Sequence, residues 1–193
     1  MLNPITNSWP FAQWGMDIVG PLPIAAVKKK LLLLATNYFK KWVEAEAYAN
    51  IKGKDVFKFF WKNIVCQFRV PQAIVVDNGL QFDNILFRTF CSKLNIKNYY
   101  SMPRYPQSNK QAKATNKTLL SVLKKIIKDV KGKWLDELPE ILWAYQTTSK
   151  WPTGATPFAL AYGMEAIIPT EIGMPTTRKT VQDQMGNDEE LIR

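Results

Sequence analysis

The order of its predicted strands and helices places this 193-residue chain in the α/β class, with a mixed five-stranded sheet flanked by helices. Two observations predict this fold. Three strand-like segments with short connections come first, as in an antiparallel meander, and the later strands alternate with segments of helical period. An apolar content of 47% is also enough for a sizeable core.

The predicted strands cover residues 14–22, 31–37, 42–48, 73–76 and 97–100. The second is nearly all apolar, which indicates burial on both faces of the sheet. The third alternates with a period of two, as strand residues do. The fourth ends at Asp77, Asn78 and Gly79, a strong turn signal.

Helices are predicted at residues 54–68, 83–94, 108–132, 134–148 and 156–162. Ser108 is the expected N-cap of the long third helix, with Gln111 three residues further on. The inward residues expected on the first two helices are Val56, Phe59, Phe60, Ile64 and Val65, then Ile85, Leu86, Phe90 and Leu94. Five tryptophans are expected to be packing residues: Trp42, Trp61, Trp134, Trp143 and Trp151.

Composition excludes several chemistries from this chain. Histidine is absent, so neither Ser-His-Asp nor Cys-His catalysis nor a Cys/His zinc finger can be built from these residues. Cys66 and Cys91 lie in apolar segments, and we expect two buried thiols rather than a disulfide. No apolar run approaches the roughly 18 residues of a membrane span, and residues 1–10 lack the pattern of a signal peptide. We therefore expect a soluble intracellular protein.

The net charge of +10 is concentrated in one stretch. Residues 104–133 hold nine basic residues and a single acidic one, Asp129. A phosphate backbone favours such a stripe, through charge neutralisation and release of counterions. The alternative is a solvated helix face, which runs of charge usually are.

Two aspartates occupy positions where a carboxylate is costly unless it is used. Asp17 lies inside an apolar strand, and Asp77 lies at the carboxyl end of another, where open α/β sheets place ligands. For Asp77 alone, an Asx turn is an equally good interpretation. Two aspartates on adjacent strands would favour a divalent-metal site, because hard cations such as Mg²⁺ prefer oxygen ligands.

Six segments, in a fixed order, resemble the integrase catalytic core of gypsy-class LTR retrotransposons, a retroviral-type integrase of the RNase H-like superfamily. They read WPFAQWGMDIVGPLP (9–23), YFKKWVEA (38–45), VDNGLQF (76–82), YPQSN (105–109), LWAY (142–145) and TPFALAYG (156–163). The resemblance runs from about residue 9 to residue 172. It implies an RNase H-like core in which three acidic residues hold two Mg²⁺ (or Mn²⁺) ions for in-line attack on a phosphodiester.

The first two catalytic and metal-binding acids of the family map onto Asp17 and Asp77. The third should be a glutamate after 35 intervening residues, a position that Lys113 occupies here. An ammonium repels a divalent ion, and two unit charges ~4 Å apart interact by about 4 kcal/mol at an effective dielectric near 20. The next acid on this helix, Asp129, lies about 24 Å further along. We therefore expect at least one metal to be lost, and catalysis with it.

Two other departures from the family pattern also make the local charge more positive. Asn37 stands where relatives usually have aspartate, and Lys110 replaces a glycine. Glu to Lys and Asp to Asn each require a single G-to-A change, so we hypothesise a silenced genomic copy decaying by deamination. Closely related copies that all encode lysine at position 113 would refute this hypothesis.

The resemblance also implies DNA as a partner, a homodimer or larger assembly, and a nuclear location. Lys117 is one helical turn from Lys113, on the same face, and is the best candidate for a phosphate contact. Further candidate nucleic-acid-binding residues are Lys110, Lys124, Asn109 and Gln107.

The expected organisation is a leader (1–8), an integrase catalytic core (9–174) and a polar tail (175–193) that begins a truncated C-terminal region. Three functions remain open. One is an integrase core acting in DNA integration, and the second is a non-catalytic nucleic-acid-binding module that keeps the fold. The third, a ribonuclease of the same superfold, is disfavoured by the amino-acid sequences of segments 9–23 and 156–163.

Overall fold

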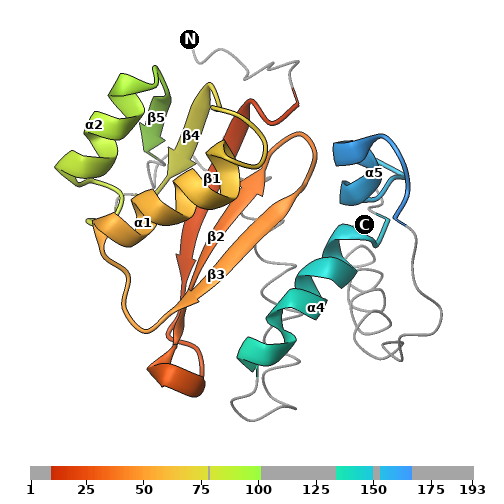
Figure 1. The fold of residues 1–193 in the computed structure, drawn as a ribbon, viewed down its shortest axis with the longest axis horizontal. Helices are drawn as coiled ribbons and strands as arrows, with labels where there is room; N and C mark the ends of the chain where they lie inside the picture. The colour runs from red at the N-terminus through yellow and green to blue at the C-terminus, as the bar shows by residue number, and fades with distance from the viewer. Residues whose placement is uncertain (1–9, 78, 101–133, 150–152, 167–193) are drawn as a thin grey trace, which may run out of the picture.

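Five strands form one mixed sheet in the computed structural model, which describes residues 10–77, 79–100, 134–149 and 153–166 (Figure 1). The strands are β1 (Gln13–Val19), β2 (Leu31–Asn37), β3 (Val43–Tyr48), β4 (Ala73–Val76) and β5 (Lys97–Tyr100), in the sheet order β3-β2-β1-β4-β5. β1, β2 and β3 pair antiparallel, whereas β4 is parallel to both β1 and β5. The predicted α/β class, the five-stranded mixed sheet and the opening meander are confirmed.

The largest difference in strand bounds is at the end of β1, which stops at Val19 instead of residue 22. Gly20 follows with φ +148°, and a Cβ atom there would lie 2.8 Å from the carbonyl oxygen of Lys30. The backbone of the next strand is thus too close for any larger residue. Only glycine fits at this crossing, and the regular strand ends before it.

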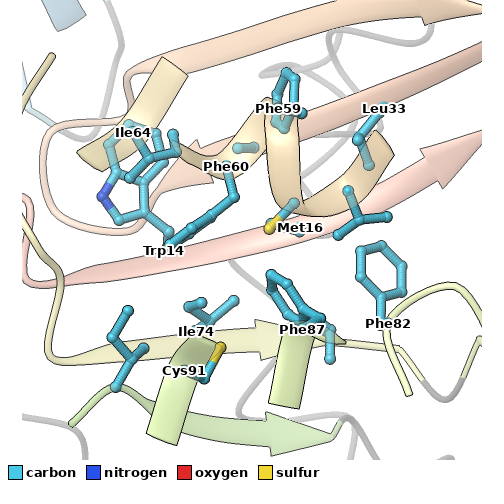
Figure 2. Close-up of a cluster of buried hydrophobic side chains, with 14 of the residues drawn as sticks. Trp14, Met16, Leu33, Phe59, Phe60, Ile64, Ile74, Phe82, Phe87 and Cys91 are labelled. Carbon is cyan, nitrogen blue, oxygen red and sulfur yellow. The ribbon is translucent and has the colours of Figure 1, made fainter. Parts of the chain in front are cut away.

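One face of the sheet is covered by two helices, α1 (Gly53–Phe60), which continues as the π-helical turn η2 (Trp61–Val65), and α2 (Ile85–Lys93). Figure 2 shows the aromatic core between these helices and the sheet. Its largest fully buried side chains include Trp14, Phe59, Phe60, Phe82 and Phe87. Full burial of such a side chain contributes about 1.5–3 kcal/mol. The inward stripe predicted for the first helix is therefore largely correct.

The other face of the sheet carries α4 (Trp134–Gln146) over β2 and β3. Trp134 is fully buried, and its indole N–H donates to the carbonyl oxygen of Pro23 at 2.8 Å. Leu32 and Leu34 face this cluster, whereas Leu33 and Ala35 face the aromatic core. β2 is thus buried on both faces, as its composition predicts. A short helix, α5 (Pro157–Tyr162), packs against Trp42 at the edge of the sheet.

The predicted inward face of the second helix is only partly right, because Phe90 and Leu94 pack against the aromatic core but the other two predicted residues do not. Ile85 is 84% exposed and Leu86 is 51% exposed, whereas Phe87 and Cys91 are buried. The Asn84 side chain accepts the backbone N–H of Phe87 at 2.9 Å and starts the helix at Ile85. This start turns the i, i+4 pair of Phe87 and Cys91 towards the core.

The predictions for the cysteines and tryptophans are correct for some residues and wrong for others. Cys91 is a buried thiol as predicted, but Cys66 is exposed beyond the last turn of η2, and both are free thiols. Trp42 and Trp134 pack as expected, whereas Trp61 and Trp143 are partly exposed. Residue 151, the helix predicted at 108–132, the leader at 1–8 and the tail at 175–193 lie outside the described residues. No helix in the described part of the chain could span a membrane.

Candidate active site

Asp17 lies on the central strand of the sheet. It lies in β1, directly across from Leu34 of β2, and is half-buried. Side chains alternate along a strand, so Asp17 points away from the aromatic core that holds its neighbour Met16. One carboxylate oxygen, Oδ1, accepts the backbone N–H of Ile18 at 2.9 Å. The carboxylate therefore lies on the face of the sheet that also carries α4.

Asp77 follows Val76, the last residue of β4, and is exposed. Its Oδ1 accepts the backbone N–H of Gly79 at 3.1 Å, which is the Asx turn that the sequence allowed. A Cβ atom on Gly79 would lie 3.0 Å from that same oxygen, so a larger residue would crowd the turn. The turn fixes the carboxylate at the end of the strand, and this does not conflict with a role as a ligand.

The pairing of β1 with β4 brings these two aspartates together. The parallel register joins Gln13 to Ala73, Trp14 to Ile74 and Gly15 to Val75. The last paired residues are Gly15 and Val75, and each aspartate lies two residues beyond its own strand's last paired residue. If the register continued unchanged, Asp17 and Asp77 would be neighbours. The structure therefore places both sequence-predicted acids at the carboxyl end of two adjacent parallel strands.

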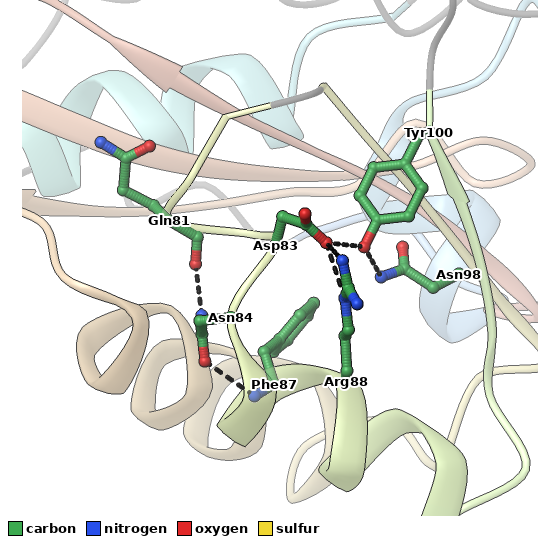
Figure 3. Close-up of polar contacts among 7 residues, drawn as sticks. All are labelled: Gln81, Asp83, Asn84, Phe87, Arg88, Asn98 and Tyr100. Carbon is green, nitrogen blue, oxygen red and sulfur yellow. Dashed lines mark hydrogen bonds and ion pairs between the residues drawn. The ribbon is translucent and has the colours of Figure 1, made fainter.

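A polar cluster that the sequence analysis missed holds the segment after Asp77 (Figure 3). Asp83 Oδ1 accepts Nε of Arg88 at 2.6 Å, a second bond from Nη2 of Arg88, and the hydroxyl of Tyr100 at 2.9 Å. The hydrogen bonds from Arg88, followed by that from Tyr100, lower the pKa of the Asp83 carboxyl. The Tyr100 hydroxyl also accepts Nδ2 of Asn98 at 3.3 Å.

This cluster links three parts of the molecule around the acidic pair. Asp83 belongs to the loop after β4, Arg88 to α2, and Tyr100 is the last residue of β5. The Asn84 side chain also donates to the carbonyl oxygen of Gln81 at 2.7 Å, which closes the same loop. The helix-capping position of Asn84 was the one signal in the sequence that could have located this loop.

Asn37, the residue that departs from the family pattern, lies at the opposite end of β1 from Asp17. It pairs with Trp14 and is completely buried. Its Nδ2 donates to the carbonyl oxygen of Gln13 at 3.0 Å, and its Oδ1 accepts the N–H of Lys40 at 2.8 Å. An ionised carboxylate could make the second bond but not the first. The amide therefore suits its surroundings here.

The remaining candidate residues lie outside the described residues. They are Lys113, Lys110, Lys117, Lys124, Asn109 and Gln107. Within the described part of the chain, no group of three or more His, Cys, Asp or Glu side chains could hold a metal ion. Asp17 and Asp77 carry hard oxygen donors of the kind that Mg²⁺ takes, and they are the two described residues at positions where the family resemblance implies metal ligands.

Comparison with known proteins shows which family and fold this domain resembles. The family model described as the integrase core domain matches residues 8–106. A chain in the cryo-EM structure of the simian T-cell lymphotropic virus intasome, in complex with the PP2A regulatory subunit B56 gamma, superposes with a TM-score of 0.66 at 20% identity. That match covers 86% of this chain and 59% of the other. The HTLV-2 integrase catalytic core domain in complex with magnesium gives a TM-score of 0.63 at 21% identity, covering 79% of this chain and 97% of that one.

The catalytic core domain of BIV integrase gives a TM-score of 0.59 at 19% identity, covering 78% of this chain and 93% of that one. These likenesses show that the mixed sheet has the fold of integrase catalytic cores. Among curated proteins, the transposon Tf2-3 and Tf2-4 polyproteins of Schizosaccharomyces pombe are each 24% identical over 173 residues. The match covers 89% of this chain but 13% of either polyprotein, so the chain spans about an eighth of their length.

Proposed function

This chain belongs to the integrase core domain family, and on that premise we propose that it is the core of a gypsy-class LTR retrotransposon integrase. Its reaction class is metal-dependent polynucleotidyl transfer on DNA, which joins element DNA to a target. We further propose that Lys113, at the position of the third acid, leaves this copy catalytically defective. The similarity to transposon polyproteins and the gypsy-like sequence segments support the retrotransposon origin.

The observation that supports this proposal is the parallel pairing of β1 with β4. Asp17 lies two residues beyond the last paired residue of β1, and Asp77 two residues beyond that of β4, so the two carboxylates come from the same end of adjacent parallel strands. Such a pair concentrates negative charge, which a divalent cation would neutralise. The HTLV-2 integrase core with a TM-score of 0.63 was solved in complex with magnesium, and we propose Mg²⁺ or Mn²⁺ as the ion of this family's site.

The complete ligand set of this chain does not fit the site that the family implies. With lysine at position 113, the formal charge of the three side chains is −1 in place of −3. A protonated lysine cannot coordinate a cation, and at about 4 Å it repels one. We therefore derive no step of catalysis through a metal here, and we expect weakened metal binding and lost chemistry.

The test is a Lys113→Glu reversion, assayed for strand transfer and nicking of DNA in Mg²⁺ and in Mn²⁺. We expect activity in the revertant and none in the unreverted chain. Lys128→Glu is a matched control, because it makes the same charge change further along the same predicted helix and should restore nothing. Adding Asp77→Asn to the revertant should abolish the activity again. Equal activity in the reverted and unreverted chains would end the proposal of a defect at position 113.

A second candidate function is a nucleic-acid-binding module that keeps the fold without the chemistry. The nine basic residues between positions 104 and 133, one of which is Lys113, favour it. This candidate predicts DNA binding that weakens steeply with salt in both forms, with a Lys113→Glu revertant that remains inactive. In either case we propose Lys117, Lys110, Lys124, Asn109 and Gln107 as DNA contacts.

The remaining features of the proposal follow from the family. We propose a homodimer or larger assembly as the working form, and the nucleus, where the target DNA lies, as its location. The domain limits stay as predicted, with a core at 9–174 between a leader and a polar tail. Light scattering of the chain with and without a short duplex measures the assembly directly.

A further inference from the structure

The hairpin between β1 and β2 extends beyond the carboxyl end of β1 (Figure 1). Its two arms are held by hydrogen bonds from the N–H of Leu22 to the oxygen of Lys30, at 2.7 Å, and from the N–H of Ala25 to the oxygen of Lys29, at 2.9 Å. Leu22 and Ala25 are buried against α4, which anchors the base of the hairpin. The hairpin is therefore a fixed projection of the core.

The tip of the hairpin, which we define as residues 24–30, has a surface unlike that of an ordinary turn. Ile24 is 69% exposed and Val27 is 82% exposed, and three consecutive lysines follow, Lys28, Lys29 and Lys30. Val27 and Lys28 have φ angles of 56° and 57°, in the left-handed region that β-branched residues rarely adopt. The fold thus maintains an unfavourable backbone that presents apolar and cationic side chains to solvent.

These lysines form no ion pair with a carboxylate of the described residues. The first turn of α4 carries Asp136 and Glu137 and begins at Trp134, which contacts the hairpin at Pro23. Even so, neither acid forms an ion pair with the tip. Three consecutive lysines with no ion pair to the described residues, next to exposed apolar groups, suit a polyanion that also has apolar surface.

The separation between the hairpin tip and Asp17 limits how far apart on a DNA duplex the two could bind. Leu22, which pairs with Lys30, is five residues beyond Asp17. At ~3.4 Å per residue, Lys30 lies at most about 17 Å along the strand direction from Asp17. Successive phosphates along one DNA strand advance ~3.4 Å, so for a duplex lying along the strand direction this limit corresponds to at most about five base pairs.

We propose that the tip of the β1–β2 hairpin binds the phosphate backbone of double-stranded DNA, within about five base pairs of the phosphate held at Asp17 and Asp77. Lys28, Lys29 and Lys30 neutralise phosphates, and Ile24 and Val27 pack against the sugars between them. This inference rests on the proposed function, because it needs DNA to be the ligand of the acidic site.

The first test compares two triple variants of the full chain. One combines Lys28→Gln, Lys29→Gln and Lys30→Gln. The control combines Lys54→Gln, Lys58→Gln and Lys93→Gln, three exposed lysines of α1 and α2 on a face away from the hairpin. Binding to a 30-base-pair duplex is measured over a series of salt concentrations. We expect the log–log salt slope to fall by about 2.7 in the hairpin variant, since each phosphate contact contributes ~0.9, and to stay unchanged in the control.

The outcomes separate the inference from the proposed function. Equal changes in both variants, or an unchanged slope in the hairpin variant, would overturn the hairpin surface while leaving DNA binding intact. A parent chain that binds no duplex at any salt concentration would overturn the proposed function and the hairpin surface together. Because the substituted lysines are on the surface, matching thermal unfolding of both variants checks that neither result reflects misfolding.

A second measurement maps the contact directly. Val27→Cys is introduced with Cys66→Ser, which leaves the buried Cys91 as the one other thiol. Duplexes that carry a disulfide-activated tether at successive backbone positions from one 3′ end are then tested for cross-linking. We expect the highest yield within about five base pairs of the end and a lower yield beyond it. A yield that is flat along the duplex would contradict the proposed register.

Discussion

At the amino end of β1, Trp14 is fully buried and packs against Phe68 at 5.3 Å between ring centroids. At the carboxyl end of the same strand, Asp17 is half-buried and lies on the other face, beside the end of β4. The first end is closed by aromatic packing and by the amide of Asn37, whereas the second leaves two carboxylates together. The same strand thus supplies a rigid base at one end and charged side chains at the other, which is how a stable sheet can support an otherwise unfavourable charge pair.

The departures from the family pattern at positions 37 and 113 also differ in their expected effects. Asn37 replaces a family aspartate at the amino end and makes two hydrogen bonds there. Lys113 stands where the family resemblance implies a glutamate, and we propose that its charge opposes the ion the family would bind. A decaying gene would accumulate both kinds of change. The structure indicates that the substitution at position 37 is compatible with folding, and we propose that the substitution at position 113 affects function alone.

Truncation at the amino end should give the largest loss of stability. Trp14→Ala removes a fully buried indole, together with its hydrogen bond to the oxygen of Phe11 at 3.1 Å. We expect a loss of about 3–5 kcal/mol in the free energy of unfolding, from lost burial and the cavity that remains. Urea denaturation followed by tryptophan fluorescence measures it. In contrast, Asp17→Asn should change stability little, and a loss as large as that of Trp14→Ala would erase the distinction between the two ends.

Restoring the family residue at position 37 should destabilise this chain. Asn37→Asp removes the donor to the carbonyl oxygen of Gln13 and buries a carboxylate there. An unsatisfied buried group of this kind costs about 1–3 kcal/mol. Burial raises the pKa of the introduced carboxyl in the folded state, so the loss should be full at neutral pH and should shrink as the pH falls through that raised pKa. A variant more stable than the parent at pH 7 would instead support decay at this position.

Stabilisation by Mg²⁺ tests whether the acids at the carboxyl end of β1 and β4 bind a metal. We expect Mg²⁺ to stabilise the Lys113→Glu revertant and to leave the unreverted chain unchanged. At a free concentration of about ten times Kd the gain would be about 1.4 kcal/mol, because binding to the folded state alone adds RT ln(1 + [L]/Kd). Thermal unfolding with Mg²⁺, and with Ca²⁺ as an inert divalent control for the chemistry, measures it. Asp77→Asn in the revertant should remove the gain, and a persistent gain would place the ion elsewhere.

The sequence predicted most of the fold because its patterns were local. The apolar run of β2, the alternation of β3 and the stripe of α1 each reflect burial that the element itself specifies. The inward face of α2 could not be predicted in the same way, because the cap at Asn84 and not the apolar count sets its rotation. The adjacency of Asp17 and Asp77 needed the crossover that places β4 beside β1, and their family resemblance supplied this. The Asp83, Arg88 and Tyr100 cluster joins residues 17 positions apart through tertiary structure, so no sequence spacing announced it.

The smallest expected effect concerns that polar cluster, and it tests whether the loop after Asp77 is held from outside the active site. Hydrogen bonds from Arg88, then from Tyr100, lower the folded-state pKa of Asp83. A carboxyl with a lowered folded pKa stabilises the fold above its unfolded pKa, and this contribution is lost as the pH falls through the folded value. Asp83→Asn should therefore lower Tm slightly at pH 7, and the difference from the parent should shrink as the pH falls below the ordinary aspartate pKa and through the lowered folded one. Tyr100→Phe is the matched variant, since it deletes one hydroxyl and keeps the ring, and it should raise the pKa of Asp83 only in part. Because the cluster is exposed, screening by 0.5 M salt should reduce the difference for Asp83→Asn. A difference that is independent of both pH and salt would mean that Asp83 acts through loop packing and not through its charge.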